Sequence, residues 1–156
     1  MLQKQKEVIL SLLRTAEETK NFFSVYLLTY KDFLDVTEAF TDFNCESLEH
    51  KQGYIDLIEN LLCADENAKV FVEPYGIESD SENTYIYGET LIIFSRLTLD
   101  EVKNIFNNVD DIFPDDIGNI TDFNERPYSV VDESGDLRPA SEFLNEGHSV
   151  YYCWWD

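Results

Sequence analysis

The run of four apolar residues at positions 91–94, Leu-Ile-Ile-Phe, limits the possible folds of this chain more than any other feature. Successive side chains of a β-strand point to opposite faces of its sheet. A strand without a polar position therefore has to be covered on both faces, which is the pattern of a central strand. We expect this strand to lie between two apolar layers.

Other segments of the chain also have the composition of strands. We expect Pro74 to end the first of them, because proline cannot donate to a sheet. Gly88 and Glu89 predict a tight hairpin between the second and third. The sequence also predicts a turn at 132–136 and a loop or helical turn at 139–145. Five of the predicted strands are 69–75, 84–87, 90–96, 128–131 and 148–155.

Apolar residues at three- and four-residue steps predict amphipathic helices at 4–21 and 47–63. Ser47 is suited to cap the second of these helices. Thr98 followed by Glu101 forms the pattern of a capping box, which predicts the start of a third helix.

Residues 22–43 are ambiguous. Their aromatic residues step by three and four, which favours a helix, yet the stretch SVYLLTY has the composition of a buried strand. Asp35 followed by Glu38 is a second capping-box pattern. We expect a strand near 24–30 and a helical or irregular piece near 35–43.

The order of these elements indicates the fold class. Helices come first, and a mostly antiparallel sheet crossed by one helix follows, which is typical of an α+β protein. A chain of 156 residues without a linker or repeat fits one domain. We therefore predict a single compact domain over residues 1–156, with N-terminal helices packed on a mostly antiparallel sheet.

The net charge of −21 restricts the partners of the protein. A composition of 44% hydrophobic and 14% aromatic residues argues against a disordered acidic chain. An acidic surface repels phosphates and anionic lipid, so we expect no direct binding to nucleic acid and none to membranes. It attracts a basic protein partner. The alternative is that the acidity only keeps the protein soluble.

Cysteine content and the N-terminus indicate the compartment. The chain has 3 cysteines with no CxxC pair, which is typical of a reducing environment. The N-terminal segment lacks the apolar stretch of a secretory signal. No apolar run approaches the ~20 residues of a membrane helix. We expect a cytoplasmic protein.

The sequence contains no motif for a metal, a cofactor or a catalytic nucleophile. Its two histidines, His50 and His148, belong to no Cys/His cluster. Cys153 follows His148 by five residues on a predicted strand, which places the two on opposite faces. Cys45 and His50 flank a predicted helix start, where a thiol and an imidazole can approach. We expect a non-catalytic protein with no metal and no cofactor.

Acidic residues gather in two predicted loops, 76–83 and 110–116, and the chain ends in the aromatic stretch YYCWWD. Trp154 and Trp155 should face opposite sides of a strand, so one packs into the core and the other is covered by a helix or exposed. Exposed tryptophan and tyrosine often dominate the energy of interfaces. The predicted partner-binding residues are Glu78, Asp80, Glu82, Asp110, Asp111, Asp115, Asp116, Tyr152 and Trp154.

In size, charge and order of elements the chain resembles the small immunity proteins of bacterial toxin systems. The strand–helix step LIIFSRLTLDEVKNIF and the ending YYCWWD are similar elements, although neither is a specific motif. The resemblance implies an acidic cytosolic inhibitor that neutralises a basic toxin without catalysis, and it assigns no binding residues. One alternative is a nucleic-acid mimic of the anti-CRISPR or anti-restriction type. Another is an enzyme or small-ligand domain with a site that no motif reveals.

Overall fold

The computed structural model describes residues 3–34, 40–43, 51–79, 84–107 and 112–155. The helices are α1 (Gln3–Thr19), α2 (Tyr30–Leu34), α3 (Lys51–Ala64), α4 (Leu99–Asn107) and the 3-10 helix η2 (Ala140–Phe143). The strands are β1 (Val25–Thr29), β2 (Phe40–Phe43), β3 (Lys69–Ser79), β4 (Thr84–Ser95), β5 (Asp116–Asn119), β6 (Tyr128–Val131), β7 (Leu137–Pro139) and β8 (Ser149–Trp154).

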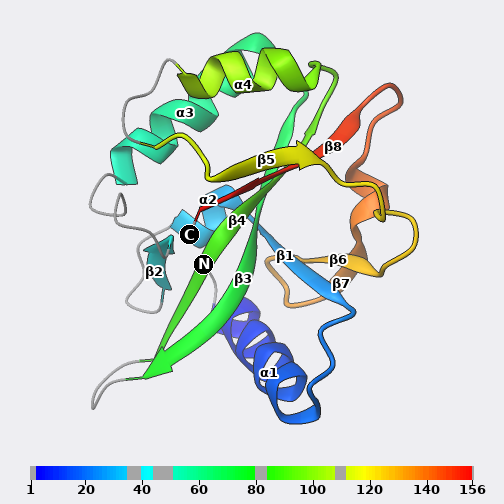
Figure 1. Cartoon of the computed structure of the whole chain (residues 1–156). Coiled ribbons are helices and arrows are strands. Elements are labelled where there is room, and N and C mark those ends of the chain that lie inside the picture. Colours follow the sequence, from blue (N-terminus) through cyan, green and yellow to red (C-terminus); the bar gives the residue numbers. More distant parts are fainter. Residues whose placement is uncertain (1–2, 35–39, 44–50, 80–83, 108–111, 156) are drawn as a thin grey trace.

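The eight described strands form one sheet in the order β5-β8-β4-β3-β1-β6-β7, and β2 pairs with β4 outside this path (Figure 1). Five pairings are antiparallel, and the β1–β6 and β2–β4 pairings are parallel. Helix α1 packs on β3 and β6, while α3 and α4 lie together at the other end of the molecule (Figure 1). The predicted α+β class, with helices on a mostly antiparallel sheet, is confirmed.

Strand β4 lies between β3 and β8 and is buried on both faces. Leu91 and Ile93 belong to one apolar cluster, and Ile92 and Phe94 belong to a second. None of these four side chains is more than 2% exposed. The central strand predicted from the continuous apolar run is therefore confirmed.

The first cluster, which we call the helical core, joins α1, α3 and α4 to the sheet. Trp155, directly after β8, packs against Tyr54 of α3 and Phe106 of α4, with ring centroids 5.4 and 6.1 Å apart. Its indole N–H donates to the carbonyl of Ile112 at 2.9 Å. Trp155 is buried and Trp154 is half-buried, so the prediction that only one of the two tryptophans enters the core is confirmed.

The second cluster, which we call the aromatic core, covers the opposite face of the sheet. Phe94 contacts Phe71 and Phe123, with centroids 5.1 and 5.5 Å apart. Phe123 contacts Tyr128 at 5.0 Å, and Phe143 of η2 contacts Phe71 at 5.9 Å. Short segments around 120–128 and η2 therefore cover this face, with no long helix among the described residues that pack there.

The predicted helices agree with α1, α3 and α4 apart from their ends. Thr98 and Glu101 form the predicted capping box: the Thr98 N–H donates to the Glu101 carboxylate at 3.0 Å, and the Glu101 N–H donates to the Thr98 hydroxyl at 3.2 Å. The predicted cap at Ser47 and the Asp35–Glu38 pair lie outside the described residues. The sequence missed α2, a single turn directly after β1.

The predictions that Pro74 ends a strand and that Gly88 and Glu89 form a hairpin are wrong. Glu73 pairs with Thr90, whereas Pro74 pairs with Gly88, so Glu89 is an extra residue in β4. Such a bulge interrupts the ladder and accommodates a proline within β3. A Cβ at Gly88 would lie 2.8 Å from the Glu73 carbonyl oxygen, so this close approach requires glycine.

Three segments form strands instead of the predicted loops or the predicted helical or irregular piece. Residues 76–79 continue β3 and pair with 84–87 of β4. Residues 116–119 form β5 on the edge of β8, and residues 40–43 form β2 beside β4. In each segment a neighbouring strand offers backbone hydrogen bonds, which local composition does not reveal.

Asp65 links the end of α3 to the sheet. Its fully buried carboxylate accepts hydrogen bonds from the Ser95 hydroxyl at 2.8 Å and from the N–H groups of Arg96 and Asn67 at 3.0 and 3.2 Å. His148 Nε2 lies 4.0 Å from it. Burial by itself raises the pKa of Asp65, but these hydrogen bonds, together with the charge interaction with His148, hold it below the ordinary value of 3.8.

We expect Asp65→Asn to lower the free energy of unfolding by about 2–3 kcal/mol at neutral pH, because an amide cannot accept from all three donors. The folded-state pKa lies below the unfolded value of 3.8. The stabilisation by Asp65 is therefore present above pH 3.8 and is lost as the pH falls through the folded-state pKa. Denaturant unfolding of the wild type and of the variant at several pH values should show the difference between their free energies of unfolding shrinking in acid. A pH-independent difference would contradict the role of the ionised carboxylate.

Candidate functional site

One row of the sheet places Asp116, Trp154, Thr90 and Glu73 side by side on four neighbouring strands. Asp116 pairs with Trp154, Trp154 pairs with Thr90, and Thr90 pairs with Glu73. Paired residues on neighbouring strands point to the same face of a sheet. Tyr152 lies two residues before Trp154 on β8 and points to the same face, which is the face of the aromatic core.

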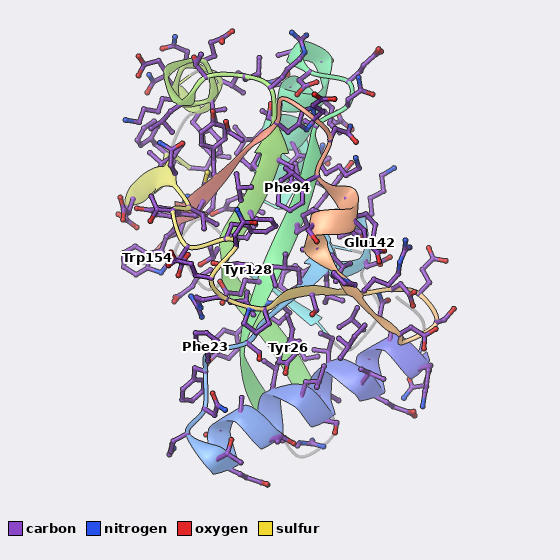
Figure 2. The ribbon with its side chains drawn as sticks, turned by 90° about the vertical axis from the view of Figure 1, so that its right-hand side faces the viewer. Phe23, Tyr26, Phe94, Tyr128, Glu142 and Trp154 are labelled. Carbon is purple, nitrogen blue, oxygen red and sulfur yellow. The ribbon has the colours of Figure 1, made fainter. Side chains whose placement is uncertain are left out.

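The surface beside this row is hollowed by a cavity of about 540 Å³. We call it the acidic–aromatic depression and define it by six lining residues: Glu73, Asp116, Asp122, Tyr128, Tyr152 and Trp154. In the described part of the chain, no lysine or arginine lines it. Figure 2 shows Trp154 at the margin of the ribbon and Tyr128 further over the sheet. The depression thus combines three carboxyl groups with three aromatic rings.

Two tyrosine–aspartate pairs form much of the depression. The Tyr152 hydroxyl donates to Asp116 at 2.9 Å, and the Tyr128 hydroxyl donates to Asp122 at 3.3 Å. Burial, followed by the charge of Asp122, raises the pKa of Tyr128 to about 12. The hydrogen bond to Asp116 is the main cause that raises the pKa of Tyr152. Both phenols therefore stay protonated at neutral pH and keep donating to their carboxylates.

Gly118 of β5 makes room for one of these pairs. It pairs with Tyr152, and a Cβ at this position would lie 3.2 Å from the Tyr152 ring and hydroxyl. The missing side chain therefore lets the ring lie close over β5, where its hydroxyl reaches Asp116 two residues away.

Arg126 connects the depression to an exposed apolar segment. Its guanidinium lies 5.7 Å from the centre of the Tyr128 ring and 3.7 Å from the Asp122 carboxylate. It also donates to the backbone carbonyls of Phe22 and Phe23, each at 3.0 Å. Phe22 and Phe23, which we call the phenylalanine tip, are 61% and 57% exposed. The backbone of the tip is therefore held in place while both rings face solvent.

Glu73 lies between the depression and a second cavity of about 580 Å³, which Phe22 and Arg126 also line. No described residue is seen to donate a hydrogen bond to its carboxyl group. Burial raises the pKa of Glu73 above its ordinary value of 4.5; the charge of Arg126 opposes this shift and Glu89 adds to it. Ionised Glu73 is consequently a cost to the folded state.

We expect Glu73→Gln to stabilise the protein at neutral pH, because glutamine keeps the shape and removes the poorly solvated charge. The folded-state pKa exceeds the unfolded value, so wild-type stability falls as the pH rises from 4.5 through the folded-state pKa. Thermal unfolding measured from acid to neutral pH should show the Tm of the variant rising relative to that of the wild type across that window. If the Tm of both proteins changed in parallel with pH, ionised Glu73 would not be a cost to stability.

The structure brings together three of the predicted partner-binding residues, Asp116, Tyr152 and Trp154. Asp115 is exposed beside them but does not line the depression. The backbone of Glu78 lies in β3, where it pairs with Tyr85. The remaining four predicted residues lie outside the described residues: Asp80, Glu82, Asp110 and Asp111.

Sequence reasoning missed Glu73, Asp122, Tyr128 and Arg126. Glu73 is the one charged residue in the interior of the predicted strand 69–75, and an isolated charge in such a run was the available signal. Asp122, Arg126 and Tyr128 share a short segment, but its approach to β8 depends on the tertiary fold.

The described residues contain no group of three or more His, Cys, Asp or Glu side chains placed to hold a metal ion. None of the described helices is long and apolar enough to cross a membrane. No protein-family model matches the chain, and comparisons with curated proteins and with solved structures find no match. The chemistry of the depression is therefore the main guide to function: it is suited to accept positive charge and to pack against rings.

Proposed function

We propose that this is a non-catalytic interaction protein of the immunity type, which binds and neutralises a basic protein partner such as a bacterial toxin. The acidic–aromatic depression and the phenylalanine tip form the binding surface. The convergence of three carboxyl groups and three rings in the depression carries the proposal. Carboxylates steer a basic surface into place, and aromatic side chains supply the anchoring contacts.

The mixture of rings and carboxylates favours a protein partner over nucleic-acid mimicry. A mimic needs a row of negative charges at phosphate-like spacing. Tyrosine and tryptophan are instead enriched at protein–protein interfaces. Exposed Phe22 and Phe23 beside the depression extend this apolar contact.

A second candidate is acid–base chemistry at Glu73. A partly buried carboxyl group with a raised pKa is a property of general acids. Purified protein tested on panels of glycoside and ester substrates would support this candidate only if it showed turnover that Glu73→Gln abolished. Turnover unchanged by Glu73→Gln would exclude it.

The main test measures association with a basic protein captured from the native host and then purified. We expect the association rate constant to fall with rising salt and to drop roughly threefold to tenfold in Asp116→Lys, because the reversed charge repels the partner. Glu59→Lys, an equal charge change on an exposed position of α3, is the matched control. A salt-independent rate that Asp116→Lys leaves unchanged would refute the proposal.

The phenylalanine tip should act on dissociation instead. We expect Phe23→Ser to raise the dissociation rate constant about tenfold, as loss of an aromatic anchor does, and to leave the salt dependence unchanged. The ring is 57% exposed, so stability should change little. Leu137→Ser, at a 48% exposed position on β7, is the control. Equal effects of the two variants would exclude the tip from the interface.

A further inference from the structure

The depression contains one tyrosine–aspartate pair that already binds a cation. Tyr128 donates to Asp122, and the guanidinium of Arg126 contacts both residues, the ring at 5.7 Å and the carboxylate at 3.7 Å. A guanidinium fits such a pair because its plane stacks on a ring while its N–H groups point to a carboxylate. The protein thus shows within its own chain that a guanidinium can lie against this combination of groups, while the hydrogen bonds of Arg126 go to the backbone carbonyls of Phe22 and Phe23.

The second pair has the same composition, but no described lysine or arginine occupies it. Tyr152 donates to Asp116 at 2.9 Å, and among the described residues no basic side chain forms an ion pair with Asp116. The carboxylate therefore keeps acceptor sites that the phenol does not use.

Trp154 adds a second ring to this pair. It lies two residues from Tyr152 on β8, so both rings are on one face, with backbones about 7 Å apart. It also pairs directly with Asp116 across the strands. Two rings at this separation beside one carboxylate can contact a planar cation from two sides. A lysine ammonium has neither the plane nor the fork of donors that uses all three groups.

We propose that Asp116, Tyr152 and Trp154 form a site for the guanidinium of an arginine that the basic partner presents. The site repeats the contacts that Asp122 and Tyr128 make with Arg126, and Trp154 takes part as an additional ring. This inference rests on the proposed function and specifies the chemistry of its central contact.

The test titrates the protein with the peptide acetyl-Gly-Arg-Gly-amide while the indole N–H signals of the two tryptophans are recorded by NMR. The signal of Trp154 should shift. That of Trp155 should stay, because its N–H is buried and bonded to Ile112, so it serves as an internal control. The citrulline peptide, which is neutral but similar in shape, should cause no shift, and the lysine peptide a weaker one.

Variants assign the effect to the three residues. We expect Asp116→Asn and Tyr152→Leu each to weaken binding of the arginine peptide roughly threefold to tenfold, from the loss of one exposed charge or ring contact. Asp115→Asn removes an equal charge one residue away, outside the depression, and should leave the affinity nearly unchanged. In each variant, an indole N–H signal of Trp155 at its wild-type position confirms that the fold around Trp155 is retained.

Three results would overturn the inference: an unmoved Trp154 signal, an equal shift with the citrulline or lysine peptide, or equal losses in Asp116→Asn and Asp115→Asn. Its failure is distinguishable from failure of the proposed function. A basic partner that still associates in a salt-dependent way would leave the proposed function standing while this site falls. A protein that binds neither the peptide nor any basic partner would refute both.

Discussion

The burial of β4 on both faces is the constraint on which the rest of the structure depends. Leu91 and Ile93 require one apolar cover, and Ile92 and Phe94 require another. Three helices provide the first. Among the described residues, short segments around 120–128 and η2 provide the second. The depression is the part of this face that the cover leaves open, where β4 changes from buried Ile92 to half-buried Thr90.

The bulge at Glu89 allows β4 to be buried on both faces and also to pair with β3 in a long hairpin. Ile86 and Leu91 are an odd number of residues apart, yet both belong to the helical core. Regular alternation would place them on opposite faces, and the extra residue restores them to one face. The same bulge shifts the register of β3 against β4 directly after Glu73. Glu73, which lines the depression, therefore lies on one side of the shift, and the part of β3 from Pro74 onward lies on the other.

Two carboxyl groups show how differently this fold treats buried acid. Asp65 receives three hydrogen bonds, so its pKa falls and its charge stabilises the protein. Glu73 is half-buried without comparable donors, so burial raises its pKa and its charge is a cost. A charge retained at a cost to stability is typical of a functional surface. This contrast supports placing function at the depression and structure at the junction of α3 with the sheet.

The sequence by itself determined the features that depend on neighbours along the chain. The apolar run identified the central strand, three- and four-residue steps identified the long helices, Thr98 and Glu101 identified a cap, and alternation separated Trp154 from Trp155. Only the tertiary structure decided where polar segments pair. Residues 76–79 and 116–119 became strands because β4 and β8 offer them backbone hydrogen bonds. The site has the same origin: Glu73, Asp122 and Tyr128 meet Tyr152 through sheet register and chain crossing, which no local pattern of side chains encodes.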